Sequence, residues 1–347
     1  MTNLRRRNWA LAFVLLALGF ALVRKIGGAH SADAHASDSV LEMEVIPRTP
    51  ERLARGKYLV DGVLWCATCH SEIDWSKRPL EAVAGTRFGG HIFGPEFGLP
   101  APFRVVAPNI SPDPDFGAGK WKDADFARAL RRGIGHDGRT LFDMMPSDEF
   151  SHLSDEDLAS VIVYLRSVPP VHLQRPQTSL PEQMTKGLQP IAAADHVPEP
   201  DQSDRVHYGS YLVTAGQCRW CHTPVGEKDE LLTGMDFSGG HTFSGPFGPH
   251  GRQVVDLATL NLTPDPSGIP YFDKATFVKA LRTGHVGARQ LSTLMPWSNF
   301  RNLTDDDLAA IFAYLRTLTP VKHRVDNTEP PTYCKVCRHK HGYGNMN

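Results

Sequence analysis

Two five-residue stretches, Cys66-Ala67-Thr68-Cys69-His70 and Cys218-Arg219-Trp220-Cys221-His222, decide the interpretation of this sequence. Both follow the pattern C-x-x-C-H, in which two thiols lie about one helical turn apart and a histidine follows directly. This spacing lets each thiol add to one vinyl group of a haem and brings the imidazole beneath the iron. The alternative is a disulfide or zinc cluster, but two such stretches in one chain favour two covalently bound haem c groups. The predicted proximal iron ligands are His70 and His222.

Composition narrows the class of protein. The chain has 347 residues, of which 41% are hydrophobic and 22% are charged, and this suits a globular protein of two domains with additional segments. The formal net charge of −1 offers no basic field for a nucleic-acid partner. Four of the six cysteines lie in the two C-x-x-C-H stretches, so the sequence does not resemble a disulfide framework.

The N-terminus predicts export. Three arginines at 5–7 precede an apolar run from Trp9 to Val23, which is short for a membrane span and long for a signal peptide. Possible cleavage sites follow, but Arg24 directly after the run is unusual for a cleaved peptide. We therefore expect residues 1–29 to be a signal peptide or an N-terminal anchor, and residues 30–47 to be a linker.

The main feature of the chain is an internal repeat. Sequence elements of the first half recur in the second half at offsets of 150 to 153 positions. They include Gly-x-Tyr-Leu-Val at 56 and 209, Gly-Gly-His at 89 and 239, Asn-x-[Ser/Thr]-Pro-Asp-Pro at 109 and 261, and Met-Pro at 145 and 295. Each C-x-x-C-H stretch is thus the start of a longer repeating unit.

The repeat predicts a mainly α fold with two tandem cytochrome c domains of class-I type, at residues 48–172 and 204–322. A first helix runs into each haem stretch, Gly/Pro-rich loops at 71–114 and 223–266 wrap the haem, and second helices begin near Asp123 and Asp273. The last helices have N-cap candidates at Ser154 and Thr304, followed by apolar residues at helical spacing. The Pro-bearing segment 173–203 is expected to be an interdomain linker, and residues 323–347 a basic tail.

The distal iron ligands must recur in both units. Met145 and Met295 each precede a proline just ahead of the last helix, where a thioether ligand is expected and the proline stiffens the loop. His91 and His241, each after Gly-Gly, are the alternative, and an open site is a third possibility. Chain order and the repeat favour Met145 and Met295, with Met144 as the local alternative to Met145.

The anionic haem propionates require hydrogen-bond donors. Candidates that recur in both units are the pairs Asn109 with Asn261, Arg131 with Arg282, and Arg139 with Arg289. A solvated arginine or a turn-capping asparagine is the plainer interpretation of these positions. Tyr58, Tyr211, Trp65 and Trp220 are expected to pack against the haem edges.

The repeated set of motifs resembles the cytochrome c subunits of membrane-bound bacterial dehydrogenases that act on alcohols, aldehydes and sugars, and of molybdenum hydroxylases. The resemblance implies that His70, Met145, His222 and Met295 ligate iron, and that the chain is an electron-transfer protein and not itself an enzyme. It further implies a dehydrogenase partner, a quinone or terminal oxidase as acceptor, and a periplasmic location, either soluble or attached to the inner membrane. Many such subunits carry three haem motifs, whereas this chain has two. The rival function is a dihaem enzyme of peroxidase or thiosulfate-oxidising type, with one open or unusually ligated haem.

The tail contains a third C-x-x-C, Cys334-Lys335-Val336-Cys337, which is followed by Arg338 in place of histidine. A histidine displaced by one residue does not suit a third haem. Three interpretations stay open: a disulfide, a metal site with His339 and His341, or a remnant without function.

Overall fold

The chain was analysed as a computed structural model, which describes residues 45–97, 99, 101–226, 230–246 and 255–344. Helices predominate, and every sheet among these residues has two strands. The predicted export segment at 1–29 and most of the 30–47 linker lie outside the described residues. Within the described part, no helix combines the length and the apolar character needed to cross a membrane.

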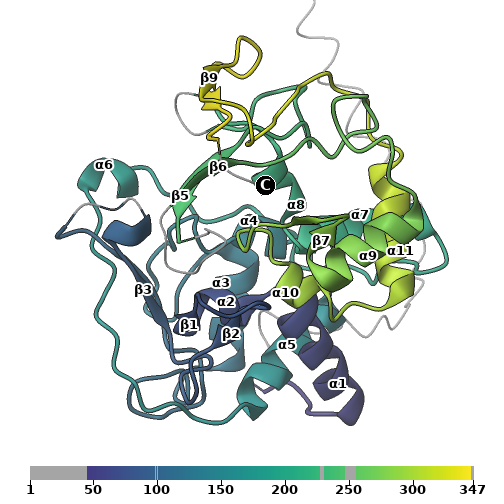
Figure 1. The fold of residues 1–347 in the computed structure, drawn as a ribbon. Helices are drawn as coiled ribbons and strands as arrows, with labels where there is room; N and C mark the ends of the chain where they lie inside the picture. The colour runs from purple at the N-terminus through teal and green to yellow at the C-terminus, as the bar shows by residue number, and fades with distance from the viewer. Residues whose placement is uncertain (1–44, 98, 100, 227–229, 247–254, 345–347) are drawn as a thin grey trace, which may run out of the picture. The chain divides into compact units, whose positions relative to one another are not determined.

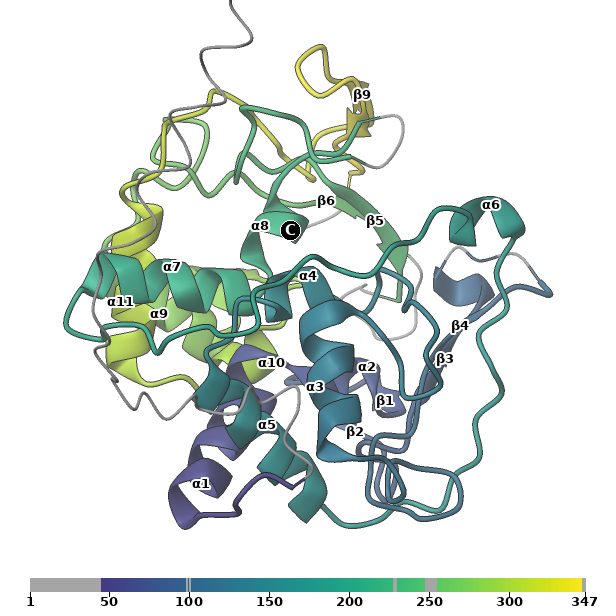
Figure 2. The same cartoon turned by 180° about the vertical axis from the view of Figure 1, so that it is seen from behind.

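A similar order of helices, with one two-stranded hairpin between them, appears twice along the chain, although several short elements belong to one series alone (Figures 1 and 2). The first series is α1 (Pro50–Tyr58), the π-helical turn η1 (Leu59–Val63), α2 (Cys66–Cys69), β1 (Ile73–Asp74), β2 (Glu81–Ala82), β3 (His91–Phe93), η2 (Pro95–Phe97), β4 (Val105–Ala107), α3 (Asp123–Arg132), α4 (Ser147–Phe150) and α5 (Asp155–Ser167). After α6 (Glu182–Thr185), the second series is α7 (Arg205–Ala215), α8 (Cys218–His222), β5 (Thr242–Gly245), β6 (Val255–Ala258), α9 (Lys274–Thr283), β7 (His285–Val286), β8 (Arg289–Gln290), α10 (Trp297–Phe300) and α11 (Asp305–Leu315), followed by β9 (Thr332–Tyr333) and β10 (Lys340–His341).

The last helix of each series begins where its cap was predicted. The hydroxyl of Ser154 accepts from the backbone N–H of Asp157 at 3.1 Å, and the hydroxyl of Thr304 accepts from that of Asp307 at the same distance. These bonds satisfy N–H groups that have no partner inside the helix. The apolar stripe that begins at Leu158 in α5 and at Leu308 in α11 is buried, as expected for the core side of each helix.

The first and last helices of each series pack closely, α1 on α5 and α7 on α11, in both views (Figures 1 and 2). The glycine of each repeated Gly-x-Tyr-Leu-Val lies where the first helix of its series crosses the last. A Cβ atom at Gly56 would lie 1.9 Å from the carbonyl oxygen of Ser160, and one at Gly209 would lie 2.0 Å from that of Ala310. Glycine is required at both positions because the two backbones nearly touch.

Two tyrosines join the two series reciprocally. The hydroxyl of Tyr211 donates to the carboxylate of Asp157 at 2.6 Å, and the hydroxyl of Tyr58 donates to that of Asp307. The expectation that Tyr58 and Tyr211 pack against haem edges is therefore wrong. Each hydroxyl instead reaches the N-terminus of the other series' last helix, where the carboxylate also compensates the helix dipole.

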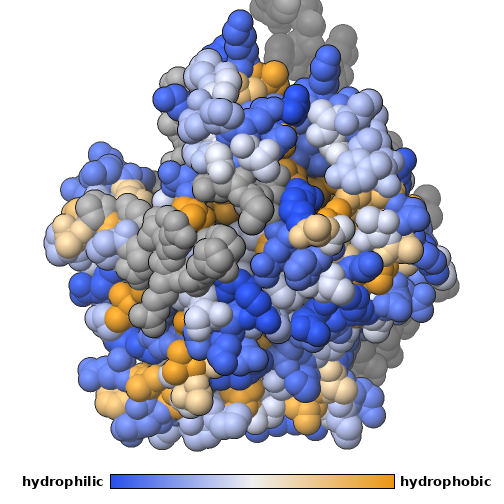
Figure 3. All heavy atoms as spheres, viewed as in Figure 1, coloured by the Kyte–Doolittle hydropathy of each residue, from blue (hydrophilic) through white to orange (hydrophobic). Residues whose placement is uncertain are grey.

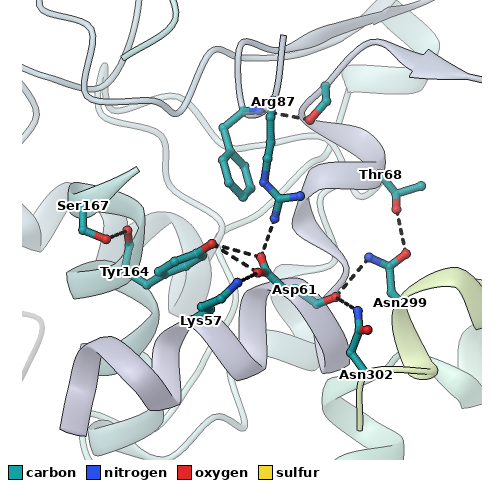
Figure 4. Close-up of polar contacts among 10 residues, drawn as sticks. Lys57, Asp61, Thr68, Arg87, Tyr164, Ser167, Asn299 and Asn302 are labelled. Carbon is teal, nitrogen blue, oxygen red and sulfur yellow. Dashed lines mark hydrogen bonds and ion pairs between the residues drawn. The ribbon is translucent and has the colours of Figure 1, made fainter. Parts of the chain in front are cut away.

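Asp61 forms a second junction between the series, drawn in Figure 4. Its carboxylate accepts from Lys57, Arg87 and Tyr164, all of the first series. Its backbone oxygen accepts from the side-chain amides of Asn299 and Asn302, which lie at α10 and just after it. One residue therefore holds the turn after α1 and the helix that follows Met295 of the second series.

The Gly/Pro-rich stretches contain more regular structure than predicted. The strands β3 and β4 form one antiparallel hairpin, and β5 and β6 form its counterpart. The segment 173–203 lies along the first series: Ser179 pairs with Arg104, and Ile191 donates its N–H to the carbonyl of Arg132 at 3.0 Å. On the face shown in Figure 3, hydrophobic side chains form small groups among hydrophilic ones.

Candidate haem sites

Each C-x-x-C-H stretch forms one helical turn that begins after a residue in the left-handed region. Trp65, before Cys66, has φ 42°, and Gln217, before Cys218, has φ 62°. The backbone N–H of His70 donates to the carbonyl of Cys66 at 2.9 Å, which closes the first turn. The turn places both thiols and the imidazole at the end of one short helix, as the spacing requires.

The two motif histidines are held in one tautomer. Nδ1 of His70 lies 2.8 Å from the carbonyl oxygen of Pro108, and Nδ1 of His222 lies 2.7 Å from that of Leu260. Because a carbonyl oxygen only accepts, Nδ1 must carry the proton, and Nε2 keeps its lone pair for a metal. Burial lowers the pKa of His222 to about 4 and also lowers the pKa of His70, so both rings are neutral at physiological pH.

Each motif opens onto a cavity. The first, of about 490 Å³, is lined by Cys66, Cys69, His70 and Met145 together with apolar side chains. The second, of about 330 Å³, is lined by Cys218, Cys221, His222 and Met295. The predicted thioether and imidazole ligands of each unit thus share one cavity.

The alternative histidines lie outside the walls of the two cavities. Nδ1 of His91 lies 2.9 Å from a carboxylate oxygen of Glu72, and Nδ1 of His241 lies 3.0 Å from the carbonyl oxygen of Trp220. Neither residue is among the described residues that line the two cavities. The geometry therefore favours the methionines over His91 and His241 as partners of the motif histidines.

The Met-Pro dipeptides are held by the short helices that follow them. The N–H of Ser147 donates to the carbonyl of Met145 at 2.7 Å, and the N–H of Trp297 donates to that of Met295 at 2.7 Å. Pro146 and Pro296 stand between these partners as the caps of α4 and α10. The methionine backbone is thereby fixed by a local turn in both series.

The cavity walls contain buried polar atoms that have no hydrogen-bond partner. A haem fits these walls if its carboxylates can serve as the missing partners. Among the described residues, Nε1 of Trp65 in the first wall and the hydroxyls of Thr259 and Thr293 in the second are buried without a hydrogen bond. Arg139 and Arg289 also line the first and second cavity, respectively. Buried donors without a partner are costly, and an anionic propionate would satisfy them. These walls therefore fit a haem with two carboxylates.

The four other candidate propionate donors bond to groups within the protein. Asn109 donates to the carbonyls of Val171 and Leu173, and Asn261 makes the corresponding bonds to Val321 and His323. Arg131 is fully buried on Asp155 and the carbonyl of Leu153, and Arg282 binds Asp305 and the carbonyl of Arg301. Nε of Arg131 is buried without a partner, but the other donor atoms named here bond within the protein, and none of the four residues is among those that line the two cavities.

The two cavities share part of their walls. Five residues line both of them: Trp65, Cys69, Phe93, Met144 and Gln217. The pKa of the Cys221 thiol is raised to about 12, mainly by burial, and the nearby Cys69 thiol contributes a small part of that increase. Because Cys69 of the first motif lines the second cavity as well, the groups held in the two cavities would be neighbours.

Sequence comparison agrees with this geometry. The chain is 31% identical over 306 residues to the cytochrome c subunit of a quinone alcohol dehydrogenase from Gluconacetobacter polyoxogenes, and the match covers 82% of this chain and 61% of the relative. The chain is similar to the cytochrome c subunits of bacterial dehydrogenases. It is also 28% identical over 285 residues to the fructose dehydrogenase cytochrome subunit of Gluconobacter japonicus, over 77% of this chain and 52% of the relative. A "diheme cytochrome c-type" of Cereibacter sphaeroides is 27% identical over 269 residues, over 74% of this chain and 83% of the relative.

The matches cover only part of the length of the dehydrogenase subunits. The chain spans about three fifths of the length of the alcohol dehydrogenase subunits. No protein-family model matches it. The similarity implies covalently bound haem c. The relatives named after alcohol, fructose and gluconate dehydrogenases are the cytochrome subunits of those enzymes.

Proposed function

We propose that the chain is a dihaem c-type cytochrome that carries electrons for a partner dehydrogenase. Cys66, Cys69, Cys218 and Cys221 would hold the two haems, His70 and His222 would be the proximal ligands, and Met145 and Met295 the distal ones. The observation that carries the proposal is that both cavities bring together two thiols, an imidazole with a free Nε2, and a thioether. Each series would then be one cytochrome c domain of class-I type.

Haem iron, when bound, supplies reversible one-electron chemistry. The residues of the chain determine how the iron would be ligated and how far water could reach it. The carbonyls of Pro108 and Leu260 orient the two imidazoles, and the thioethers of Met145 and Met295, as ligands of a bound haem, would raise its reduction potential and leave no coordination position for a substrate. Apolar wall residues such as Leu130 and Phe277 exclude water. This arrangement suits a carrier and not a catalyst.

The relatives support a dehydrogenase as the electron donor, because their names identify them as its cytochrome subunits. We further propose a quinone or a terminal oxidase as acceptor and a periplasmic location, either soluble or attached through the N-terminal segment. The rapid reduction of the purified chain by the dehydrogenase that co-purifies with it from membranes would test the donor.

Electron paramagnetic resonance and near-infrared spectra of the oxidised protein test the ligands. Two low-spin His/Met signals are expected. Met145→Ala and Met295→Ala should each abolish one of them, because each removes one thioether from its cavity. Met144→Ala tests the local alternative: this side chain neighbours Met145 and lines both cavities, and its loss should keep both signals if Met145 is the ligand.

A high-spin haem in the wild-type protein, or the survival of both His/Met signals in Met145→Ala or in Met295→Ala, would contradict the ligand assignment. Iron at about one ion per chain instead of two would contradict the dihaem proposal itself.

A further inference from the structure

Four side chains of the C-terminal region converge on one point outside both haem cavities. The ligand atoms of His323, Cys334, Cys337 and His341 all lie within 4.8 Å of one another. His323, Cys337 and His341 are 1%, 2% and 9% exposed. The structure holds both cysteines as free thiols and not as a disulfide. Nε2 of His341 is buried and has no hydrogen-bond partner within the described part of the chain.

A β-hairpin presents three of these side chains. Strands β9 and β10 pair with His341 opposite Thr332, and the C-x-x-C turn connects them. The N–H of Arg338 donates to the carbonyl of Cys334 at 2.9 Å, which closes the turn. The N–H of Val336 donates to the sulfur of Cys334 at 3.4 Å, which holds this side chain within the turn.

The fourth side chain, His323, comes from the segment after α11. Its Nδ1 lies 3.1 Å from the carbonyl oxygen of Ser238, so Nδ1 carries the proton and Nε2 is free. That Nε2 lies 3.4 Å from the sulfur of Cys334. In a tetrahedral zinc site, a nitrogen and a sulfur ligand are about 3.6 Å apart, given the usual Zn–N and Zn–S bond lengths.

We propose that His323, Cys334, Cys337 and His341 form a structural zinc site that fastens the C-terminal hairpin to the second repeat. Two thiolates and two neutral imidazoles balance the charge of Zn²⁺, and a tetrahedral set of two sulfurs and two nitrogens is typical of zinc. Four protein ligands and deep burial leave no open position for a substrate. The ligand expected from sequence, His339, is not part of the set, because its Nε2 binds the carbonyl of Val225 at 2.7 Å.

In the first repeat, the segment that corresponds to the one around His323 is held by hydrogen bonds and an ion pair and not by a metal site. Asn109 binds the carbonyl of Leu173 as Asn261 binds that of His323, so Leu173 takes the place of His323. There the segment is fastened by Arg175, which donates to the carbonyl of Gly89 at 2.8 Å and pairs with Glu72 at 2.9 Å. In the second repeat, Pro224 follows the haem motif at the position of Glu72, so this ion pair cannot form.

The site has a consequence for the second haem cavity. The side chain of Asn327 bonds both the N–H and the carbonyl of Ala258 in β6, at 2.9 and 2.8 Å, and it lines that cavity. The hairpin holds this segment through the N–H of Tyr343, which donates to the carbonyl of Asn327. In both views the C-terminal segment with β9 lies beside β6 (Figures 1 and 2). Zinc would thus secure one wall of the cavity.

Elemental analysis and zinc K-edge absorption of the purified full chain with its haems test the proposal. About one zinc ion per chain is expected, with a first shell of sulfur and nitrogen. The double variant Cys334→Ser/Cys337→Ser should lose the zinc, and limited proteolysis should then cut the tail. His339→Ala is the matched control, because it changes a histidine of the same hairpin outside the set, and it should retain the zinc. The haem absorption of each variant reports whether the two repeats have folded.

Two results would overturn the proposal. One is a wild-type chain without zinc whose intact mass shows an oxidised Cys334–Cys337 pair. The other is zinc that the double variant retains, or whose absorption spectrum lacks sulfur ligands. Both readouts are independent of the axial ligands of the haems, so they separate this proposal from the proposed function.

Discussion

At the scale of single residues, Asn109 and Asn261 connect the motif histidines to the rest of each repeat. Each asparagine directly follows the residue whose carbonyl binds a histidine ring, and each is 2% exposed. Oδ1 of Asn109 accepts from both the N–H and the hydroxyl of Ser111, while Nδ2 donates to two carbonyls beyond α5. The loop that orients His70 is therefore anchored at both ends through one side chain.

Replacing Asn109 by alanine should lower the free energy of unfolding by about 2 to 3 kcal/mol, because buried partners lose their hydrogen bonds. The measurement is denaturant unfolding followed by circular dichroism. Asn302→Ala serves as the control, since its exposed side chain makes a single 3.3 Å bond to the carbonyl of Asp61, and it should cost less than about 0.5 kcal/mol. Equal losses in the two variants would show that Asn109 has no special anchoring role.

The same residues show what the sequence could predict about the site. Cys66, Cys69 and His70 could be predicted as site residues because haem attachment dictates both residue type and spacing, and Met145 because Met-Pro recurs ahead of the last helix of each repeat. The role of Arg131 stayed open in the sequence because an arginine in a repeated position serves equally well as a ligand contact or as a partner for the start of the last helix, here Asp155. Only the three-dimensional positions of competing acceptors distinguish the two.

At the scale of elements, the helix pairs α1–α5 and α7–α11 depend on close backbone contact. Gly56→Ala should lower the free energy of unfolding by at least about 2 kcal/mol, because the new methyl group would force the two helices apart. Thermal and denaturant unfolding measure the loss. Gly62→Ala is the control: its Cβ would meet only the end of the Leu303 side chain, at 3.2 Å, and it should cost less than about 1 kcal/mol. A tolerated Gly56→Ala would mean that the crossing can widen without cost.

The elements divide into those that the sequence predicts and those that it does not. The helices α3, α5, α9 and α11 carry caps and apolar periodicity long enough to recognise. The hairpin β3–β4 has three residues in each strand, too few for an alternating pattern to stand out from loop sequence. The zinc-site partner His323 was missed for a different reason: it is eleven residues from Cys334, and the fold brings the two together.

At the scale of the whole molecule, the two repeats are joined by side-chain hydrogen bonds and not only by the segment that connects them in sequence. Tyr58 and Tyr211 exchange hydrogen bonds with Asp307 and Asp157, and the chain around Asp61 binds Asn299. These contacts bring the two cavities together, so that Trp65, Cys69 and Gln217 each line both. A segment of about 30 residues, 173–203, connects the repeats in sequence, but side chains set how they meet.

Since Cys69 of the first motif lines the second cavity as well, haems held in the two cavities should be neighbours whose electronic transitions couple. We expect the circular dichroism of the Soret band to show a couplet of opposite signs, at an amplitude that does not change on dilution. The control variant Cys218→Ala/Cys221→Ala lacks the second attachment and should give a band of one sign, because a single haem has no partner with which to couple. A wild-type spectrum of one sign would mean that the shared wall does not bring the two haems together, and electron exchange between the repeats would then need another route.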